Sequence, residues 1–326
     1  MAHQTSLPSF SPAFALEPTV ENPLVAAKTT AEQLVAGLND AQAEAVVHRG
    51  GPLLIVAGAG SGKTRVLTHR IGHLLATGDA RPHEFLAITF TNKAAAEMRE
   101  RIGDLVGQAA QRMWISTFHS SCVRILRREA THIGLKSNFS IYDATDSLRL
   151  ITQIAKDAEL DPRRFAPRAI RNKVSSLKNE LVDADTFAST AAGDPWHQAV
   201  AEVYKEYENR LLTANAMDFD DLIANVVHMF DAFPAILDNY RRRFRFVLVD
   251  EYQDTNHAQY RLVRQLTGAP GEPPGVETEG GQLTVVGDSD QSIYAFRGAD
   301  IRNIVDFEHD YPDATVIRLE QNYRST

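Results

Sequence analysis

The sequence lacks several features that mark particular classes of protein. Its 326 residues include one cysteine, Cys122, so a disulfide within the chain is excluded. No apolar run approaches the ~18 residues of a membrane span, and the N-terminus lacks the basic-then-apolar pattern of a secretory signal. A basic excess is also missing, because the net charge is −8, so any nucleic-acid contact requires a local groove. These absences predict a soluble cytoplasmic protein whose thiol is reduced and at least partly buried.

What is present is ordinary globular composition, with 44% hydrophobic and 23% charged residues, and enough length for two domains. Residues 1–30 mix Ser, Pro, Ala and Thr without periodicity, which predicts a disordered tail. Further along, β-forming runs that look buried on both faces alternate with helical stretches, which predicts an α/β fold with a parallel sheet. The expected strands are residues 53–57, 85–90, 113–116, 246–249, 283–286 and 315–319.

Between residues 120 and 215 the strand signal disappears and apolar residues recur at helical spacing. We therefore expect an inserted all-helical subdomain at 120–215 that divides the α/β domain into 31–119 and 216–320. Basic residues of the insertion could contact a DNA backbone or simply form a solvated helix surface, and the sequence leaves both open. They are Arg163, Arg164, Arg168, Arg171, Lys173 and Lys178.

The strongest motif is a glycine loop between the strand at 53–57 and an amphipathic helix. It consists of Ala57, Gly58, Ala59, Gly60, Ser61, Gly62, Lys63 and Thr64. Glycines let backbone N–H groups turn toward phosphate oxygens, the lysine neutralises the β- and γ-phosphates, and the threonine hydroxyl is a ligand for Mg²⁺. Ala57 replaces the usual first glycine, but that position requires only a small residue. The motif predicts a P-loop that binds ATP and Mg²⁺, in preference to a chance flexible turn.

The apolar strand at 246–249 ends in two acids, Asp250 and Glu251. A buried strand would position both carboxylates beside the P-loop. Asp250 would then hold Mg²⁺, and Glu251 would polarise the attacking water. An acidic turn at a strand end is the alternative, and the P-loop upstream makes it the weaker one.

Several long segments carry a resemblance to a known family. They are 88–98 (ITFTNKAAAEM), 116–120 (STFHS), 217–222 (MDFDDL), 250–255 (DEYQDT), 286–298 (VGDSDQSIYAFRG) and 321–326 (QNYRST). Their order and spacing resemble the UvrD/PcrA/Rep family of superfamily 1 DNA helicases, most closely the UvrD/PcrA branch, over nearly everything after about residue 37. The resemblance implies a RecA-like ATP-binding domain with a helical insertion, and residues 321–326 as the start of a truncated second RecA-like domain.

The resemblance also implies roles around the nucleotide. Gln42 corresponds to the residue that reads the adenine edge, a task that suits an amide because it both donates and accepts hydrogen bonds. Arg65 and Tyr323 match the pair that sandwiches the adenine. Gln291 and Arg324 match residues that sense and contact the γ-phosphate, which places them with Lys63 and Glu251 in the catalytic set.

For DNA, the resemblance implies a single-strand groove that includes Phe90, His119, Tyr294, Phe296 and Arg297. Aromatic stacking accepts any base, as a motor that moves along DNA requires. Packing into the core is a serious alternative for Phe90 and Tyr294, since aromatic residues at strand ends usually point inward. Phe296 stands where the family often has tryptophan.

The implied function is an ATP-dependent DNA helicase of 3′ to 5′ polarity, acting in repair or replication on single strands and duplex junctions, with DNA-repair proteins as partners. The alternative is a truncated nucleotide- and DNA-binding module without helicase activity by itself. In the family a second RecA-like domain supplies a further arginine to the transferring phosphate, so hydrolysis by the chain alone is expected to be weak. A P-loop kinase is disfavoured because Glu251 beside Asp250 suits water as the acceptor.

Overall fold

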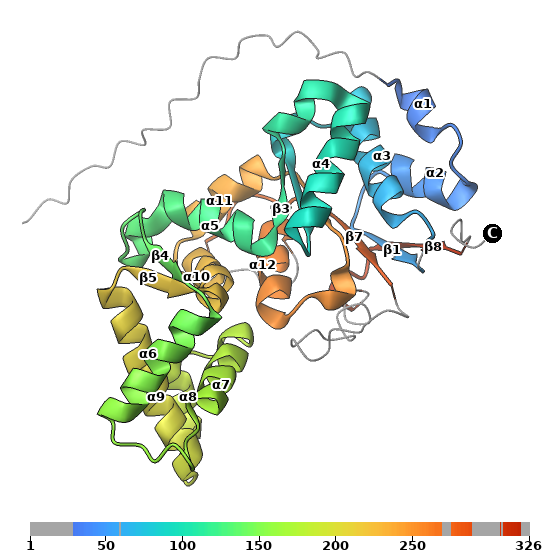
Figure 1. Ribbon diagram of the computed structural model, residues 1–326. Helices are drawn as coiled ribbons and strands as arrows, with labels where there is room; N and C mark the ends of the chain where they lie inside the picture. The colour runs from blue at the N-terminus through green and yellow to red at the C-terminus, as the bar shows by residue number, and fades with distance from the viewer. Residues whose placement is uncertain (1–28, 59, 269–274, 289–306, 308, 321–326) are drawn as a thin grey trace, which may run out of the picture.

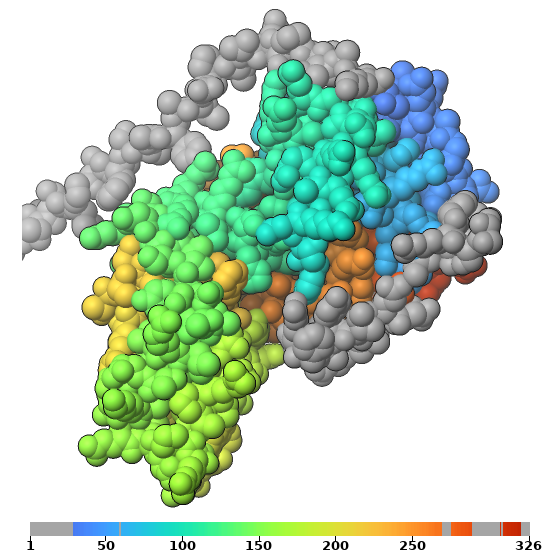
Figure 2. Space-filling model, in the orientation of Figure 1, coloured from blue at the N-terminus to red at the C-terminus, as the bar shows by residue number. Residues whose placement is uncertain are grey.

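The computed structural model describes residues 29–58, 60–268, 275–288, 307 and 309–320. The expected tail and the segment 321–326 therefore lie outside the described residues, apart from residues 29 and 30. An α/β body carries a mostly helical lobe that stands clear of it over much of its length (Figures 1 and 2). Within the described ranges, no helix combines the length and apolar character that crossing a bilayer requires.

The body is built on a six-stranded sheet with the order β3-β2-β6-β7-β1-β8, and all neighbouring pairs are parallel. This confirms the predicted α/β class with a parallel sheet. The strands are β1 (Leu53–Ala57), β2 (Phe85–Thr89), β3 (Trp114–Thr117), β6 (Phe246–Val249), β7 (Gln282–Gly287) and β8 (Thr315–Leu319). Each expected strand is present, with ends that differ by two residues or fewer.

Helices cover both faces of the sheet, because alternate residues of each strand point to opposite sides. Leu53 and Ile55 pack against α2 (Asp40–Val47), α3 (Lys63–Ala76) and α4 (Asn92–Val106). Leu54 belongs to the core on the other face, which includes side chains of α5 (Phe118–Glu129), α10 (Phe219–Ala232), α11 (Pro234–Arg243) and α12 (His257–Thr267). A short helix α1 (Ala31–Val35) precedes them, with Leu34 buried. Burial of Cys122 in this core confirms the expected buried thiol and raises its pKa.

The lobe has its own core, formed by α6 (Ala144–Asp157), α7 (Pro167–Asn179), α8 (Ala184–Thr190) and α9 (Pro195–Thr213). It is not all-helical, because β4 (Ser140–Tyr142) pairs in parallel with β5 (Ala216–Asp218) where the lobe leaves and rejoins the body. Three residues are too few for a strand period to register in the sequence. The division at residue 120 stays a prediction, although Cys122, Ile125 and Leu126 of α5 pack in the core with the sheet.

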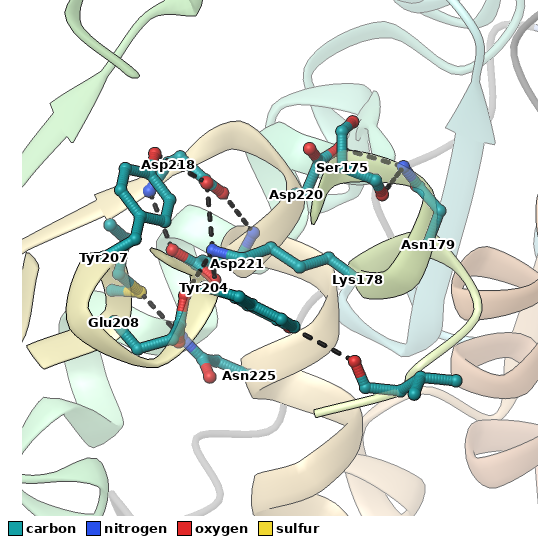
Figure 3. Close-up of polar contacts among 12 residues, drawn as sticks. Ser175, Lys178, Asn179, Tyr204, Tyr207, Glu208, Asp218, Asp220, Asp221 and Asn225 are labelled. Atoms are coloured by element: carbon teal, nitrogen blue, oxygen red, sulfur yellow. Dashed lines mark hydrogen bonds and ion pairs between the residues drawn. The ribbon is translucent and has the colours of Figure 1, made fainter. Parts of the chain in front are cut away.

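A buried ionic network joins the lobe to the body (Figure 3). The Lys178 ammonium on α7 lies 2.9 Å from Asp218 Oδ2 and 2.6 Å from Asp221 Oδ1. It also lies 2.6 Å from Glu208 Oε1 on α9, while the Tyr207 hydroxyl donates to Asp218 Oδ2 over 3.0 Å. Lys178 is therefore neither part of a solvated helix surface nor exposed for a DNA backbone, so both readings of the sequence are wrong for this residue.

Candidate nucleotide and DNA-binding site

The predicted glycine loop lies at the carboxyl end of β1, where parallel α/β sheets bind their ligands. Gly60 and Gly62 have φ angles of 78° and 88°, which other residues rarely adopt. The Ser61 hydroxyl donates to the Gly58 carbonyl over 2.7 Å, so the loop closes on itself. The helix α3 then begins at Lys63 with its first N–H groups free of helical partners. Backbone donors and a positive helix end together suit a phosphate group.

Gln42 holds this loop from α2. Its Nε2 donates to the Ser61 carbonyl over 2.9 Å and its Oε1 accepts from the Asn39 N–H over 3.3 Å, in a buried position. Both ends of the amide are engaged within the protein, and the adenine contact implied for Gln42 stays a prediction. Arg65 is exposed on the first turn of α3, as a residue that stacks on a base requires. Its implied partner, Tyr323, lies outside the described residues.

Three strand ends bring opposite charges together next to the loop. The Lys63 ammonium lies 3.3 Å from Glu251 Oε2, which follows β6, and 3.4 Å from Asp288 Oδ2, which follows β7. The φ of Glu251 is 52°, a left-handed conformation that is uncommon outside glycine and clusters at functional sites. The fold thus gathers Lys63 and Glu251 as the sequence predicted, and adds Asp288, to which the sequence assigned no role.

Asp250 is buried at the end of β6, with its N–H donating to the Ile88 carbonyl over 2.9 Å. Burial, and then the charge of Glu251, raise the pKa of Asp250 to about 6. A bound cation would stabilise the ionised form of a carboxylate in that position. Thr64, half-buried on the first turn of α3, supplies a hydroxyl from the P-loop side. Hard oxygen donors of this kind fit Mg²⁺.

Gln253 is a functional candidate that the sequence reasoning missed. Its Nε2 donates to Glu251 Oε2 over 2.9 Å, and its Oε1 accepts from the Asp288 N–H over 3.0 Å. The side chain is only 1% exposed. One amide therefore links the carboxylate after β6 to the backbone after β7. In the sequence, Gln253 is only an amide two residues after the strand-end acids. Its partners become visible only in the folded structure.

A hollow of about 850 Å³ lies beside the carboxyl ends of β2 and β3. Phe90 and His119 line it from the body, and Ser175 and Asn179 line it from α7 of the lobe. Phe219, at the start of α10, is 49% exposed and meets the His119 ring edge-to-face at 5.7 Å between centroids. Burial lowers the pKa of His119, so its ring is neutral near pH 7. Partly exposed rings in a hollow suit stacking on bases. Phe90 is only half-buried and lines the hollow, so it is not packed fully into the core.

Comparison with known proteins identifies the family of the chain. The sequence matches the family described as UvrD/REP helicase N-terminal domain over residues 38–312. The chain belongs to this family. The UvrD/REP match takes in both the P-loop and the hollow, and it confirms the family that the sequence motifs indicated.

Curated UvrD and PcrA proteins are similar over most of the chain. The ATP-dependent DNA helicase UvrD1 of Mycobacterium tuberculosis (strain ATCC 25618 / H37Rv) is 61% identical over 302 residues, which are 91% of this chain and 38% of that protein. The ATP-dependent DNA helicase PcrA of Bacillus subtilis (strain 168) is 54% identical over 294 residues, which are 90% of this chain and 38% of that protein. The chain thus spans less than half the length of these relatives.

Some of the predicted site positions lie outside the described residues. They are Ala59, Gln291, Tyr294, Phe296, Arg297, Tyr323 and Arg324. Their roles stay predictions. The described part of the site comprises the P-loop without Ala59, the acids after β6 and β7, and the hollow that Phe90 and His119 line. Phe219 also lines that hollow, and no role was predicted for this ring from the motif at 217–222.

Proposed function

We propose that this chain is the ATP-binding part of an ATP-dependent DNA helicase that moves 3′ to 5′ along one strand. The observation that carries the proposal is the meeting of Lys63, Glu251 and Asp288 at the mouth of the glycine loop. A lysine held by two carboxylates at that place is poised to exchange them for the oxygens of a triphosphate. The names of the UvrD1 and PcrA relatives support the same activity.

In the proposed complex the glycine loop and Lys63 bind the β- and γ-phosphates. Arg65 stacks on the adenine, with Gln42 at its edge, and Tyr323 covers the other face. Gln291 and Arg324 contact the γ-phosphate. Thr64 and Asp250 hold Mg²⁺, which when bound neutralises charge that develops on the phosphates.

The proposed chemistry on the protein side centres on Glu251. When Lys63 turns toward phosphate, the carboxylate of Glu251 loses that partner but keeps the hydrogen bond from Gln253. Gln253 thereby leaves one oxygen of Glu251 to accept a proton from the attacking water. Because Gln253 also holds the Asp288 N–H, the position of Glu251 is linked to the segment that leads to Gln291.

The proposed DNA site is the hollow around Phe90, His119 and Phe219, extended by Tyr294, Phe296 and Arg297. Stacking there explains how a protein of net charge −8 binds DNA without a large basic surface. Single strands and duplex junctions are the proposed substrates, DNA-repair proteins the proposed partners, and the cytoplasm the proposed location. The chain's 38% share of its relatives keeps the second reading open, a nucleotide- and DNA-binding module that needs another domain to move.

Calorimetry with ATP and Mg²⁺ tests the nucleotide site directly on this chain. Lys63→Ala is expected to abolish binding or nearly so, because Lys63 is the point charge that the loop presents to phosphate. Lys93→Ala is the matched control, since that side chain is 88% exposed and pairs with Glu97 on α4. Unchanged affinity in Lys63→Ala would remove the P-loop assignment. Stopped-flow ATPase with and without single-stranded DNA then separates a motor from a binding module.

Fluorescence anisotropy with a labelled oligonucleotide tests the DNA site. Phe219→Ala is expected to cost ~1 to 3 kcal/mol of single-strand affinity, the usual contribution of one stacked base, without changing ATP affinity. Phe233→Ala is the control, because Phe233 is 38% exposed but does not line the hollow. Equal affinities of the two variants would place the DNA elsewhere.

A further inference from the structure

Two arginines from different helices pack on one buried indole at the edge of the sheet. Trp114, the first residue of β3, is 3% exposed. The guanidinium carbon of Arg124 on α5 lies 4.0 Å from the Trp114 ring centroid, and that of Arg243 at the end of α11 lies 5.1 Å from it. The indole therefore holds both guanidinium groups in place.

Arg128, one helical turn beyond Arg124, completes what we call the arginine patch: Arg124, Arg128 and Arg243. In the part of the chain that the structure describes, none of the three takes part in an ion pair. Arg243 Nε is buried and has no hydrogen-bond partner there. The pKa of Arg243 is lowered by burial and then by the positive charges of Arg128 and Arg124, so the three guanidinium groups are close enough to repel one another.

The neighbouring carboxylate does not neutralise the arginine patch by direct contact. Glu129 accepts a hydrogen bond from the Tyr240 hydroxyl over 3.1 Å, and its other oxygen lies 3.6 Å from His132 Nδ1. Among the described residues these three guanidinium groups have no carboxylate partner, so their mutual repulsion costs stability. Packing on Trp114 explains where two of the stems lie but not why three positive charges gather there.

An exposed stripe connects the arginine patch to the hollow. Ser120, Arg124 and Arg128 recur at helical i, i+4 and i+8 spacing, and all three are exposed. The stripe begins next to His119, which lines the hollow, and runs along α5 for about 12 Å at 1.5 Å per residue. That length is enough for contacts with more than one successive phosphate of a strand.

We propose that the arginine patch binds the phosphodiester backbone of a DNA strand where it leaves the hollow along α5. This inference rests on the proposed function. Guanidinium groups match phosphate oxygens with two parallel hydrogen bonds. The Trp114 ring is buried and offers no face to a base, so the contact reads backbone and not sequence. Continuity with the hollow favours DNA over an acidic protein segment.

The test compares two oligonucleotides by anisotropy across a range of salt concentrations, a short one that fills only the hollow and one about four nucleotides longer. Arg124→Gln combined with Arg128→Gln is expected to weaken binding of the longer one about tenfold or more at low salt. The slope of log affinity against log salt should fall by about 1.4, at ~0.7 per phosphate contact. Binding of the short oligonucleotide should not change. The matched control, Arg149→Gln with Lys156→Gln, removes the same charge from exposed positions of α6.

The outcomes separate this inference from the proposed function. If the wild-type chain binds neither oligonucleotide, both are overturned. If it binds both but the arginine variant behaves like its control, the hollow stands and the arginine patch falls. Binding of poly-glutamate that the variant alone loses, with DNA affinity unchanged, would also overturn the inference and assign the patch to an acidic protein partner. Phe90→Ala should weaken both oligonucleotides without changing the salt slope.

Discussion

Replacing Lys178 by methionine should destabilise the joint between lobe and body. Methionine keeps most of the length and apolar volume of the lysine side chain but removes its charge. Lys178 is buried, and its ammonium lies within 2.9 Å of carboxylate oxygens of Asp218, Asp221 and Glu208. Without it the carboxylates of Asp218 and Asp221 stay buried with no cation beside them.

The magnitude follows from the geometry. Removing one partner of a buried ion pair costs about 3 to 5 kcal/mol, because the remaining charge is left without compensation. For a domain of this size, the melting temperature should fall by roughly 10 °C. Burial already raises the pKa of Asp221, with Asp218 adding repulsion. Protonation of these carboxyl groups in Lys178→Met should therefore recover part of the lost stability as pH falls.

Urea denaturation followed by circular dichroism, together with limited proteolysis of the lobe, measures the effect. Lys205→Met is the control, since Lys205 is exposed and its 2.7 Å ion pair with Asp185 should contribute nothing measurable. Adding Asp221→Asn to Lys178→Met should restore part of the stability by removing a buried charge. A denaturation midpoint of Lys178→Met equal to that of Lys205→Met would refute the reasoning.

Other predictions concern the nucleotide site. Asp250→Asn should stabilise the fold at pH 7. The pKa of Asp250 rises from 3.8 to about 6 on folding, so the free energy of unfolding decreases by up to ~3 kcal/mol as pH increases from about 4 to about 6. Denaturation at pH 4 and pH 7 measures this, and an equal effect of the substitution at both would contradict it. In any longer protein that contains this chain, Glu251→Gln should lower turnover by ~10² or more with ATP binding intact; a matching loss of affinity would make Glu251 structural. Gln253→Met, which keeps the site's charge but removes both hydrogen bonds, should lower turnover about tenfold with ATP affinity unchanged, and should cost nothing further in a Glu251→Gln background. Losses that simply multiply would mean that Gln253 does not act through Glu251.

The strands and the nucleotide motifs could be predicted from the sequence, because each depends on residues close together in the chain. Apolar runs such as 53–57 and 246–249 are buried on both faces, so composition alone marks them. The sequence predicts the acids after 246–249 beside the P-loop because the two motifs occur together, and the fold places Glu251 Oε2 3.3 Å from the Lys63 ammonium.

Other features depend on partners that are distant in the sequence. Lys178 looked like one more base on a helix, and its burial follows from carboxylates 40 and 43 residues away. Gln253 bridges to a backbone N–H 35 residues further on. The arginine patch requires α5 and α11 to meet over Trp114. No periodicity or local motif carries such information, because it resides in the packing of the elements.

The strand order also places the charged residues at the glycine loop and the rings of the hollow on different strands. Lys63, Glu251 and Asp288 follow β1, β6 and β7, whereas Phe90 and His119 follow β2 and β3 across the boundary between β2 and β6, although Asp254 and Asn256 after β6 also line the hollow. That boundary is a hydrogen-bonded seam, closed at its end by the Asp250 N–H on the Ile88 carbonyl. Exchange of the loops after β2 and β3 would therefore change one wall of the hollow while Lys63, Glu251 and Asp288 keep their contacts.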